Sequence, residues 1–122
     1  MQIYGIGVDT ATISRIEKSM ARPGFLEKCF GPAEQTLFAH SHAATVAVNF
    51  AAKEALSKAL GTGLMGFLWT EVQVLRKESG APYFAFSGAM QQYITQQKFT
   101  AHVSLTHEGD GATAFVILEK DL

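Results

Sequence analysis

The stretch from residue 43 to residue 60 constrains the fold most, because it combines a long helical pattern with many alanines. Alanine has the highest helix propensity, and its small side chain lets a second backbone come close to the helix. Larger apolar residues such as Val46 and Phe50 are spread among the alanines, and Gly61 supplies a stop signal. The sequence therefore predicts one long helix against which other elements pack closely.

Shorter elements are predicted on either side of this helix. In chain order they are a strand, three short helices, the long helix, a hairpin, a further helix and a second hairpin, at residues 3–8, 13–22, 25–30, 33–38, 43–60, 68–86, 88–97 and 101–118. Thr10 or Thr12 can cap the first helix, and Ser87 can cap the last. This order predicts a single α+β domain over residues 1–122, with a small, mainly antiparallel sheet packed on the alanine-rich helix.

Composition narrows the classes of function. With 48% hydrophobic and 17% charged residues, the chain can bury a core, and its net charge of −1 argues against a nucleic-acid partner. The single cysteine, Cys29, cannot form an internal disulfide, and neither a signal peptide nor a membrane span is predicted. We therefore expect a soluble, cytoplasmic protein without a membrane partner. A chain of 122 residues is too small to enclose a deep ligand site easily. A binding cleft between subunits is therefore the natural alternative.

Three ionisable residues are candidates for chemistry. Gly5 and Gly7 let the backbone of the first strand come close to a neighbouring element. Asp9 follows them at the end of this strand, where a carboxylate suits a hard cation such as Mg²⁺, although it can equally cap the next helix. Glu54 and Lys58 are four residues apart on one face of the long helix, which is also the spacing of an exposed ion pair. A metal-binding carboxylate with an ammonium one turn away would suit a substrate that contains a diphosphate.

The four histidines do not favour a zinc site. His102 and His107 are separated by an odd number of positions on one predicted strand, so their side chains point to opposite faces. His40 and His42 fall in a predicted loop without a cysteine nearby. His107, at the end of its strand, is the best placed of the four to contact a ligand.

Three segments have a more specific pattern: YGIGVD at residues 4–9, FAAKEALSKALGTG at residues 50–63 and VSLTH at residues 103–107. Together they resemble the corresponding segments of holo-acyl-carrier-protein synthases, a family of 4′-phosphopantetheinyl transferases. The second segment is the most specific of the three. The GAP tripeptide at residues 80–82 also fits the pattern of this family. The resemblance extends over nearly the whole chain.

The resemblance implies the 4′-phosphopantetheinyl transferase fold and a role in fatty acid biosynthesis. The implied reaction moves phosphopantetheine from coenzyme A to a serine of an apo acyl carrier protein and releases adenosine 3′,5′-bisphosphate. By this resemblance Asp9 and Glu54 hold Mg²⁺ against the diphosphate, and Lys58 stabilises charge on the bridging phosphate. Glu54, directly or through a metal-bound water, is the candidate for taking the serine proton.

The resemblance also implies two binding surfaces and an assembly. His107 is expected near the 3′-phosphate and Pro82 beside the adenine. The residues implied in binding coenzyme A are Lys53, Lys58, Gly63, Pro82, Thr106 and His107. Those implied in docking an acidic helix of the carrier are Arg15, Arg22, Phe25 and Phe50. A homotrimer with three sites between subunits is also implied, which agrees with the small size of the chain.

The chain departs from the family pattern at positions that usually bear cations. Asn49 stands where the family usually has an arginine that meets coenzyme A phosphate, and Ala81 where lysine is frequent. The loop at residues 64–67 is one residue shorter and lacks the common arginine. These changes weaken phosphate binding unless other residues compensate. Two alternatives stay open: a non-catalytic relative that binds coenzyme A or the carrier, which Asn49 favours, and an unrelated small enzyme acting on a metal-bound phosphate ester.

Overall fold

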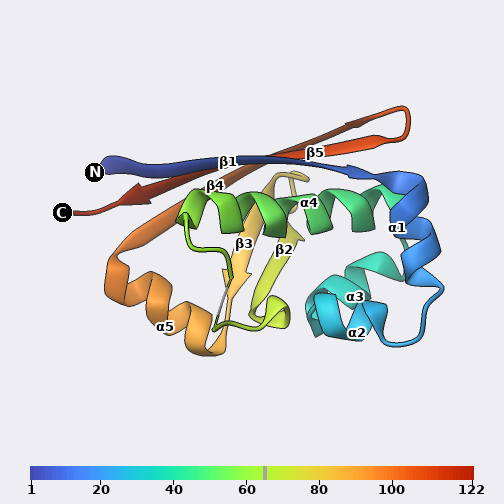
Figure 1. Cartoon of the computed structure of the whole chain (residues 1–122), viewed down its shortest axis with the longest axis horizontal. Coiled ribbons are helices and arrows are strands. Elements are labelled where there is room, and N and C mark those ends of the chain that lie inside the picture. Colours follow the sequence, from blue (N-terminus) through green and yellow to red (C-terminus); the bar gives the residue numbers. More distant parts are fainter. Residues whose placement is uncertain (65) are drawn as a thin grey trace.

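The computed structural model describes residues 1–64 and 66–122. The predicted α+β fold is confirmed (Figure 1). Two predicted strand bounds are wrong: the first strand continues to Thr12, so Asp9 lies within it and not at its end, and the first hairpin strand begins at Val72 after a 3-10 turn at residues 69–71. No helix among the described residues combines the length and apolarity needed to cross a membrane. In chain order the elements are β1 (Gln2–Thr12), α1 (Ile13–Met20), α2 (Phe25–Cys29), α3 (Pro32–Phe38), α4 (Ala43–Leu60), η1 (Trp69–Glu71), β2 (Val72–Arg76), β3 (Pro82–Phe86), α5 (Gly88–Gln97), β4 (Phe99–Glu108) and β5 (Gly111–Lys120).

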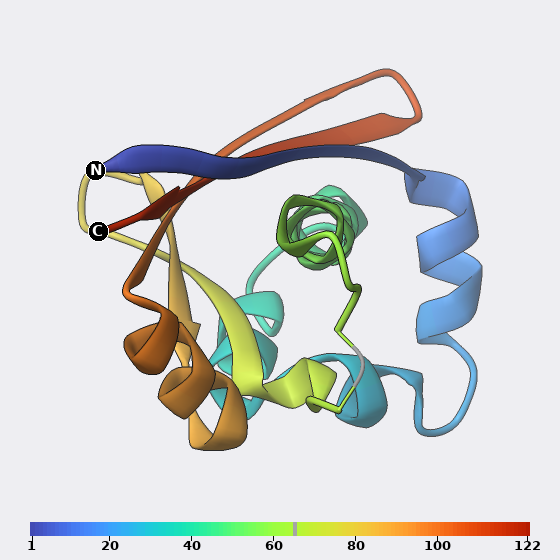
Figure 2. The ribbon, with the colours of Figure 1, turned by 60° about the vertical axis from the view of Figure 1, so that its left-hand side comes forward.

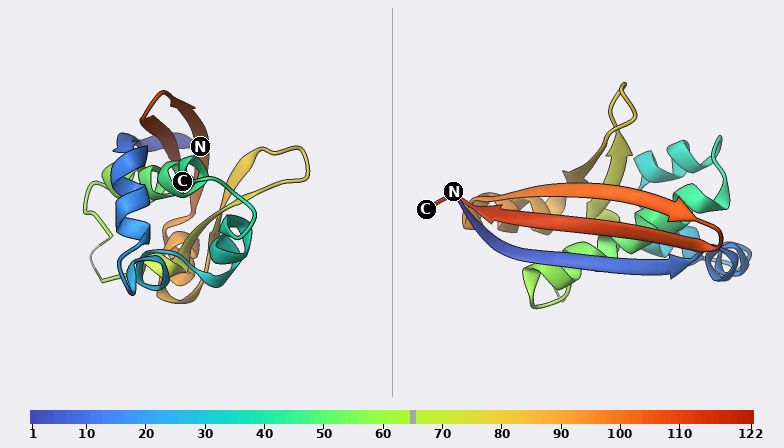
Figure 3. Two further views of the ribbon diagram at one scale, coloured as in Figure 1. Left: turned by 90° about the vertical axis from the view of Figure 1, so that its right-hand side faces the viewer. Right: turned by 90° about the horizontal axis from the view of Figure 1, so that it is seen from above.

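The strands form two antiparallel sheets where the sequence suggested one. The long strands β1, β5 and β4 form a three-stranded sheet in that order, and β2 and β3 form a two-stranded sheet. Figure 3 shows the three long strands side by side, with β1 and β4 at the two edges. Asp9 on β1 is paired with Ala114 on β5, which is paired with Leu105 on β4. Because paired residues share a face, all three side chains point to the same side of the sheet.

The α4 helix lies between the three-stranded sheet and the remaining elements (Figures 1 and 2). Ala47, Ala51, Ala52, Ala55 and Leu56 therefore have no exposed surface. A helix that is covered on nearly all sides needs no single apolar stripe, and this explains why small apolar residues surround α4. As predicted, the helix ends at a glycine in the left-handed conformation, with φ of 80°.

A close contact between β1 and α4 places the candidate carboxylate beside the helix. A Cβ atom at Gly5 would overlap the carbonyl oxygen of Ala59, and one at Gly7 would overlap that of Ala55. Only glycine fits at these two positions. Asp9 follows on the same face of β1, so the contact holds it against the C-terminal half of α4.

The N-terminus of α1 is capped by a residue far away in the sequence. Thr12 occupies the N-cap position but makes no capping hydrogen bond, and the Thr10 hydroxyl is bound to a threonine on β5. The backbone N–H of Ser14 instead donates to Oδ1 of Asp110 at 3.0 Å, and its hydroxyl donates to Oδ2 at 2.6 Å. The prediction of a threonine cap is wrong, because the β4–β5 turn brings a carboxylate to the positive end of the helix.

The outer face of the three-stranded sheet is apolar and is not covered by other parts of the described chain. Ile3 is 66% exposed, Ile6 60% and Val8 53%, although all three are large apolar residues. Ile6 is paired with Ile117, and Val8 with Phe115, which is 40% exposed. These residues, called the apolar strip below, form a continuous surface of the kind that marks a protein contact.

Candidate active site

Asp9 and Lys58 meet at the junction of β1 and α4. The Nζ atom of Lys58 lies 3.0 Å from Oδ1 of Asp9 and donates a second hydrogen bond to the carbonyl oxygen of Val8, also at 3.0 Å. The side chain of Lys58 is 55% exposed and that of Asp9 is 20% exposed. Such a solvent-open ion pair contributes little to stability, so the ammonium can leave Asp9 for an anionic ligand at small cost.

Glu54 lies one helical turn before Lys58 and is only partly exposed. Burial raises the pKa of Glu54 above its ordinary value, the charge of Asp9 raises it further, and Lys58 opposes both effects. Two carboxylates that repel each other in this way are stabilised by a divalent cation. We call Asp9, Glu54 and Lys58 the acidic centre.

The acidic centre fits a Mg²⁺ ion by the chemistry of its donors. Mg²⁺ prefers oxygen ligands and is usually held by one or two carboxylates, with water and substrate phosphates as its other ligands. Asp9 and Glu54 offer such a pair. Among residues 1–64 and 66–122 no group of three or more histidine, cysteine, aspartate or glutamate residues could hold a metal ion.

A pocket of about 260 Å³ lies where the N-terminal half of α4, the β2–β3 hairpin and the end of β4 meet. It brings together Pro82, Thr106 and His107, which the sequence assigned to the nucleotide cleft. Arg76 also lines this pocket and was not foreseen. The predicted hairpin could have indicated this position, because Arg76 on one strand is paired with Pro82, a predicted site residue, on the other. The other lining residues are Thr45, Val48, Gly80 and Leu105.

The acidic centre and this pocket lie on opposite sides of α4 in one chain. Thr45, in the pocket, precedes Glu54 by nine positions. In an α-helix this separation corresponds to about 13 Å along the axis and roughly half a turn around it. On the sheet, Asp9 lies on the β1 edge and His107 on the β4 edge, with β5 between them. Within one chain the acidic centre and the pocket are thus two separate places.

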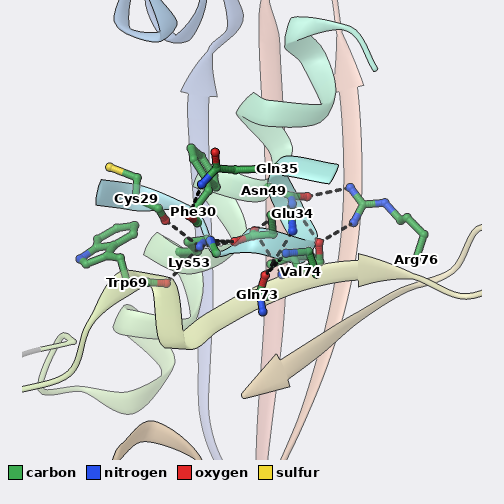
Figure 4. Close-up of polar contacts among 12 residues, drawn as sticks. Cys29, Phe30, Glu34, Gln35, Asn49, Lys53, Trp69, Gln73, Val74 and Arg76 are labelled. Atoms are coloured by element: carbon green, nitrogen blue, oxygen red, sulfur yellow. Dashed lines mark hydrogen bonds and ion pairs between the residues drawn. The ribbon is translucent and has the colours of Figure 1, made fainter. Parts of the chain in front are cut away.

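Lys53 lies in the interior. Its side chain has no exposed surface, and its Nζ atom donates to Oε1 of Glu34 at 2.6 Å and to the carbonyl oxygens of Cys29 at 2.7 Å and Trp69 at 3.1 Å (Figure 4). Burial lowers the pKa of Lys53 and raises the pKa of Glu34, because each charged form has lost water. The assignment of Lys53 to the coenzyme A cleft is not supported, because all three ammonium hydrogens are used inside the domain.

Asn49 continues the same network towards the pocket. It has no exposed surface, and its Nδ2 atom donates to Oε2 of Glu34 at 3.0 Å and to the carbonyl oxygen of Val74 at 2.9 Å. Its Oδ1 atom accepts a hydrogen bond from Nη2 of Arg76 at 2.7 Å. Figure 4 shows Asn49 between Glu34 and Arg76. Asn49 therefore connects the interior ion pair to the pocket wall.

Three of the predicted docking residues lie together. The ring centroids of Phe25 and Phe50 are 6.3 Å apart, and the guanidinium carbon of Arg22 is 6.0 Å from the centroid of Phe25. Arg22 and Phe25 also line a shallow pocket of about 390 Å³. Arg15 is exposed on the neighbouring helix α1. Because Phe50 precedes Glu54 by one helical turn, this surface adjoins the acidic centre.

Comparison with known proteins decides the family. Residues 5–116 match the ACPS model of the 4′-phosphopantetheinyl transferase superfamily. A holo-[acyl-carrier-protein] synthase of Burkholderia ambifaria is 41% identical over 100% of this chain and 90% of its own length. The chain belongs to the holo-[acyl-carrier-protein] synthases.

Solved structures of these synthases have the same fold. The synthase from Neisseria meningitidis superimposes with a TM-score of 0.89 at 30% identity, covering 98% of this chain and 100% of that one. The synthase from Helicobacter pylori, crystallised in complex with coenzyme A, gives a TM-score of 0.81 at 30% identity and covers 93% of this chain and 99% of that one. The predicted family, fold and enzyme class, a phosphopantetheinyl transferase, are confirmed.

Gly63, which the resemblance implies in binding coenzyme A, lies near the C-terminal end of α4. Gly63 has a positive φ of 73° in the loop that follows the helix and is not among the residues lining the 260 Å³ pocket. Its contact with coenzyme A stays a prediction. The shortened loop at residues 64–67 includes Met65, which lies outside the described residues.

Proposed function

We propose that this synthase transfers 4′-phosphopantetheine from coenzyme A to a serine of an apo acyl carrier protein, with Mg²⁺ as its metal. The observation that carries the proposal is the convergence of Asp9, Glu54 and Lys58 at one solvent-open junction. Phosphoryl transfer to a hydroxyl group depends on positioning and on neutralising charge, and these three residues serve both needs. The cytoplasmic location expected from the sequence stays a prediction.

The roles of the three residues follow from their positions. Asp9 and Glu54 would hold Mg²⁺, which supplies positive charge beside the diphosphate of coenzyme A. Glu54 accepts the serine proton while the serine oxygen bonds to the β-phosphorus. The bond from that phosphorus to the bridging oxygen breaks, and its electron pair leaves with adenosine 3′,5′-bisphosphate. Lys58 moves from Asp9 to this leaving phosphate and stabilises its charge.

The release of adenosine 3′,5′-bisphosphate tests the reaction from the side of the nucleotide. With coenzyme A, Mg²⁺ and an apo carrier, chromatography should detect this product in proportion to the carrier added. Without carrier, coenzyme A should stay intact. Binding of coenzyme A with no release for any of several carriers would favour the alternative of a non-catalytic relative.

We further propose that the complete site forms between copies of the chain. The acidic centre and the 260 Å³ pocket lie on opposite sides of α4, and the apolar strip on β1 and β5 is exposed in the single chain. A neighbouring copy that covers this strip can bring its nucleotide pocket to the acidic centre of the first. A cyclic homotrimer, which the resemblance implies, would then contain three equivalent sites.

Mixing two impaired variants tests this composite site. Asp9→Ala damages the acidic centre, and His107→Glu places a negative charge in the nucleotide pocket. If each site draws on two copies, refolding the variants together should restore about a quarter of wild-type activity by random assortment. A mixture of Asp9→Ala with Glu54→Gln is the matched control and should stay inactive, because every acidic centre is damaged. Equal inactivity of both mixtures would place the whole site within one chain.

Charge reversal on α1 tests the docking surface. Arg15→Glu should raise the KM for the carrier by about 5- to 10-fold, since it repels an acidic helix, and should leave the KM for coenzyme A nearly unchanged. The increase should shrink at high salt. The control is Lys98→Glu, which reverses an exposed charge just after α5. It should leave the KM for the carrier unchanged. Equal damage to the KM of both substrates would mean that Arg15 serves the nucleotide site.

A further inference from the structure

The guanidinium of Arg76 has no acidic partner in the described part of the chain. Its side-chain partner is the neutral amide of Asn49, at 2.7 Å. The carboxylate of Glu34, whose charge acts on Arg76, is already paired with Lys53 at 2.6 Å. This network therefore holds two cations and one carboxylate, and the excess positive charge lies on Arg76. That charge is at the wall of the pocket that also contains His107.

Arg76 also has hydrogen-bond donors available. A guanidinium has five N–H groups. Within the described residues Nη1 donates to the carbonyl oxygens of Val74 at 3.4 Å and Leu75 at 3.2 Å, and Nη2 donates to Asn49. Two N–H groups are then left for a ligand, one of them on Nε. Phosphate oxygens accept such charge-assisted bonds strongly.

Asn49 determines where this guanidinium lies. Both hydrogens of its Nδ2 atom are donated, one to Glu34 and one to the carbonyl oxygen of Val74, so its Oδ1 atom must face Arg76. Asn49 is fully buried, which keeps this orientation fixed. The position at which the sequence lacks an expected arginine therefore supports an arginine that comes from β2.

We propose that Arg76 binds the 3′-phosphate of coenzyme A and that Asn49 positions it. The inference rests on the proposed function, because that function makes the pocket a nucleotide site. The diphosphate of coenzyme A is required at the acidic centre, where its reacting phosphorus lies. The 3′-phosphate monoester is the remaining phosphate group, and its charge suits a partly buried cation beside His107.

Calorimetric titration of the intact protein, in Mg²⁺ and without carrier, tests the assignment. Arg76→Gln removes the charge and keeps an amide donor. It should raise the Kd for coenzyme A by about 10- to 100-fold and leave the Kd for 3′-dephospho-coenzyme A within about twofold of the wild-type value. Arg76→Lys should recover part of the affinity, because lysine restores the positive charge but lacks the planar guanidinium that binds phosphate through two N–H groups. The control Lys77→Gln removes an adjacent exposed cation and should change neither Kd.

Two results would overturn the inference. One is an equal loss of affinity for both ligands, which would place Arg76 at the diphosphate or show general damage to the pocket. The other is unchanged coenzyme A binding by Arg76→Gln in a protein whose wild type binds it. If Arg76→Gln does not fold, Arg76→Lys provides the same comparison between the two ligands. Failure of the wild type to bind coenzyme A would instead refute the proposed function, and this inference with it.

Discussion

Replacing Glu54 by glutamine should lower kcat by a factor of roughly 100 or more while the protein stays folded. Glutamine preserves the size of the side chain but lacks the negative charge that both a metal ligand and a general base require. The substitution also removes the repulsion between Glu54 and Asp9, so the free energy of unfolding should not fall. Steady-state kinetics and thermal unfolding of the same preparation measure the two effects.

The control for this variant is Asp121→Asn, which neutralises an exposed carboxylate near the C-terminus. It should turn over at the wild-type rate. A near-wild-type kcat for Glu54→Gln would remove Glu54 from the chemistry. A loss of activity that only follows a lower melting temperature would show that Glu54 is needed for stability.

Replacing Lys53 by methionine should lower the free energy of unfolding by about 3–5 kcal/mol. The substitution leaves Glu34 buried without the cation that lies 2.6 Å from it in the wild type. A loss of this size is a large part of the 5–15 kcal/mol that roughly bounds the stability of a small domain. Urea unfolding monitored by circular dichroism measures it.

A second substitution shows whether the unpaired charge is the cause. Glu34→Gln combined with Lys53→Met leaves no buried charge, and the glutamine oxygen can still accept from the backbone N–H of Gly31 or Val74. The double variant should therefore be more stable than the sum of the two single losses predicts. Folded Lys53→Met should keep a near-wild-type KM for coenzyme A. A raised KM with normal stability would return Lys53 to the ligand cleft.

Features that depend on local sequence were predictable. Alanine spacing and a terminal glycine located α4, because helix propensity and the stop signal both act within a few residues. Gly5 and Gly7 indicated a close backbone contact, and the structure places α4 there. The spacing of Glu54 and Lys58 placed them on one face of the helix, and the same reasoning separated His102 from His107.

Features that depend on contacts distant in sequence were not predictable. Ser87, like Thr12, stands at an N-cap position without making the capping bond, because the carboxylate of Glu71 reaches the N–H of Ala89 at 2.9 Å. Lys53 differs from Glu54 by one position, yet that step of about 100° turns it from the surface to the interior. Such outcomes depend on which elements pack on each side of α4.

The role of Asn49 was also not predictable, because the resemblance shows only that this position lacks the arginine usual in the family. A single chain shows that an arginine is missing at that position, but it does not show what contacts the position. The structure supplies this information, because Arg76 reaches Asn49 from a different element, 27 positions away. That Arg76 on β2 can supply the cation missing at position 49 on α4 is visible only in the folded domain.

Intact-mass spectrometry of the carrier measures the transfer of phosphopantetheine itself. An apo acyl carrier protein is incubated with this protein, coenzyme A and Mg²⁺, and its mass is compared with that of the starting carrier. We expect the carrier to gain one phosphopantetheine group at its serine, and a chelator to abolish the gain. If every carrier in a panel stays unmodified while the protein still binds coenzyme A, the protein does not catalyse this transfer.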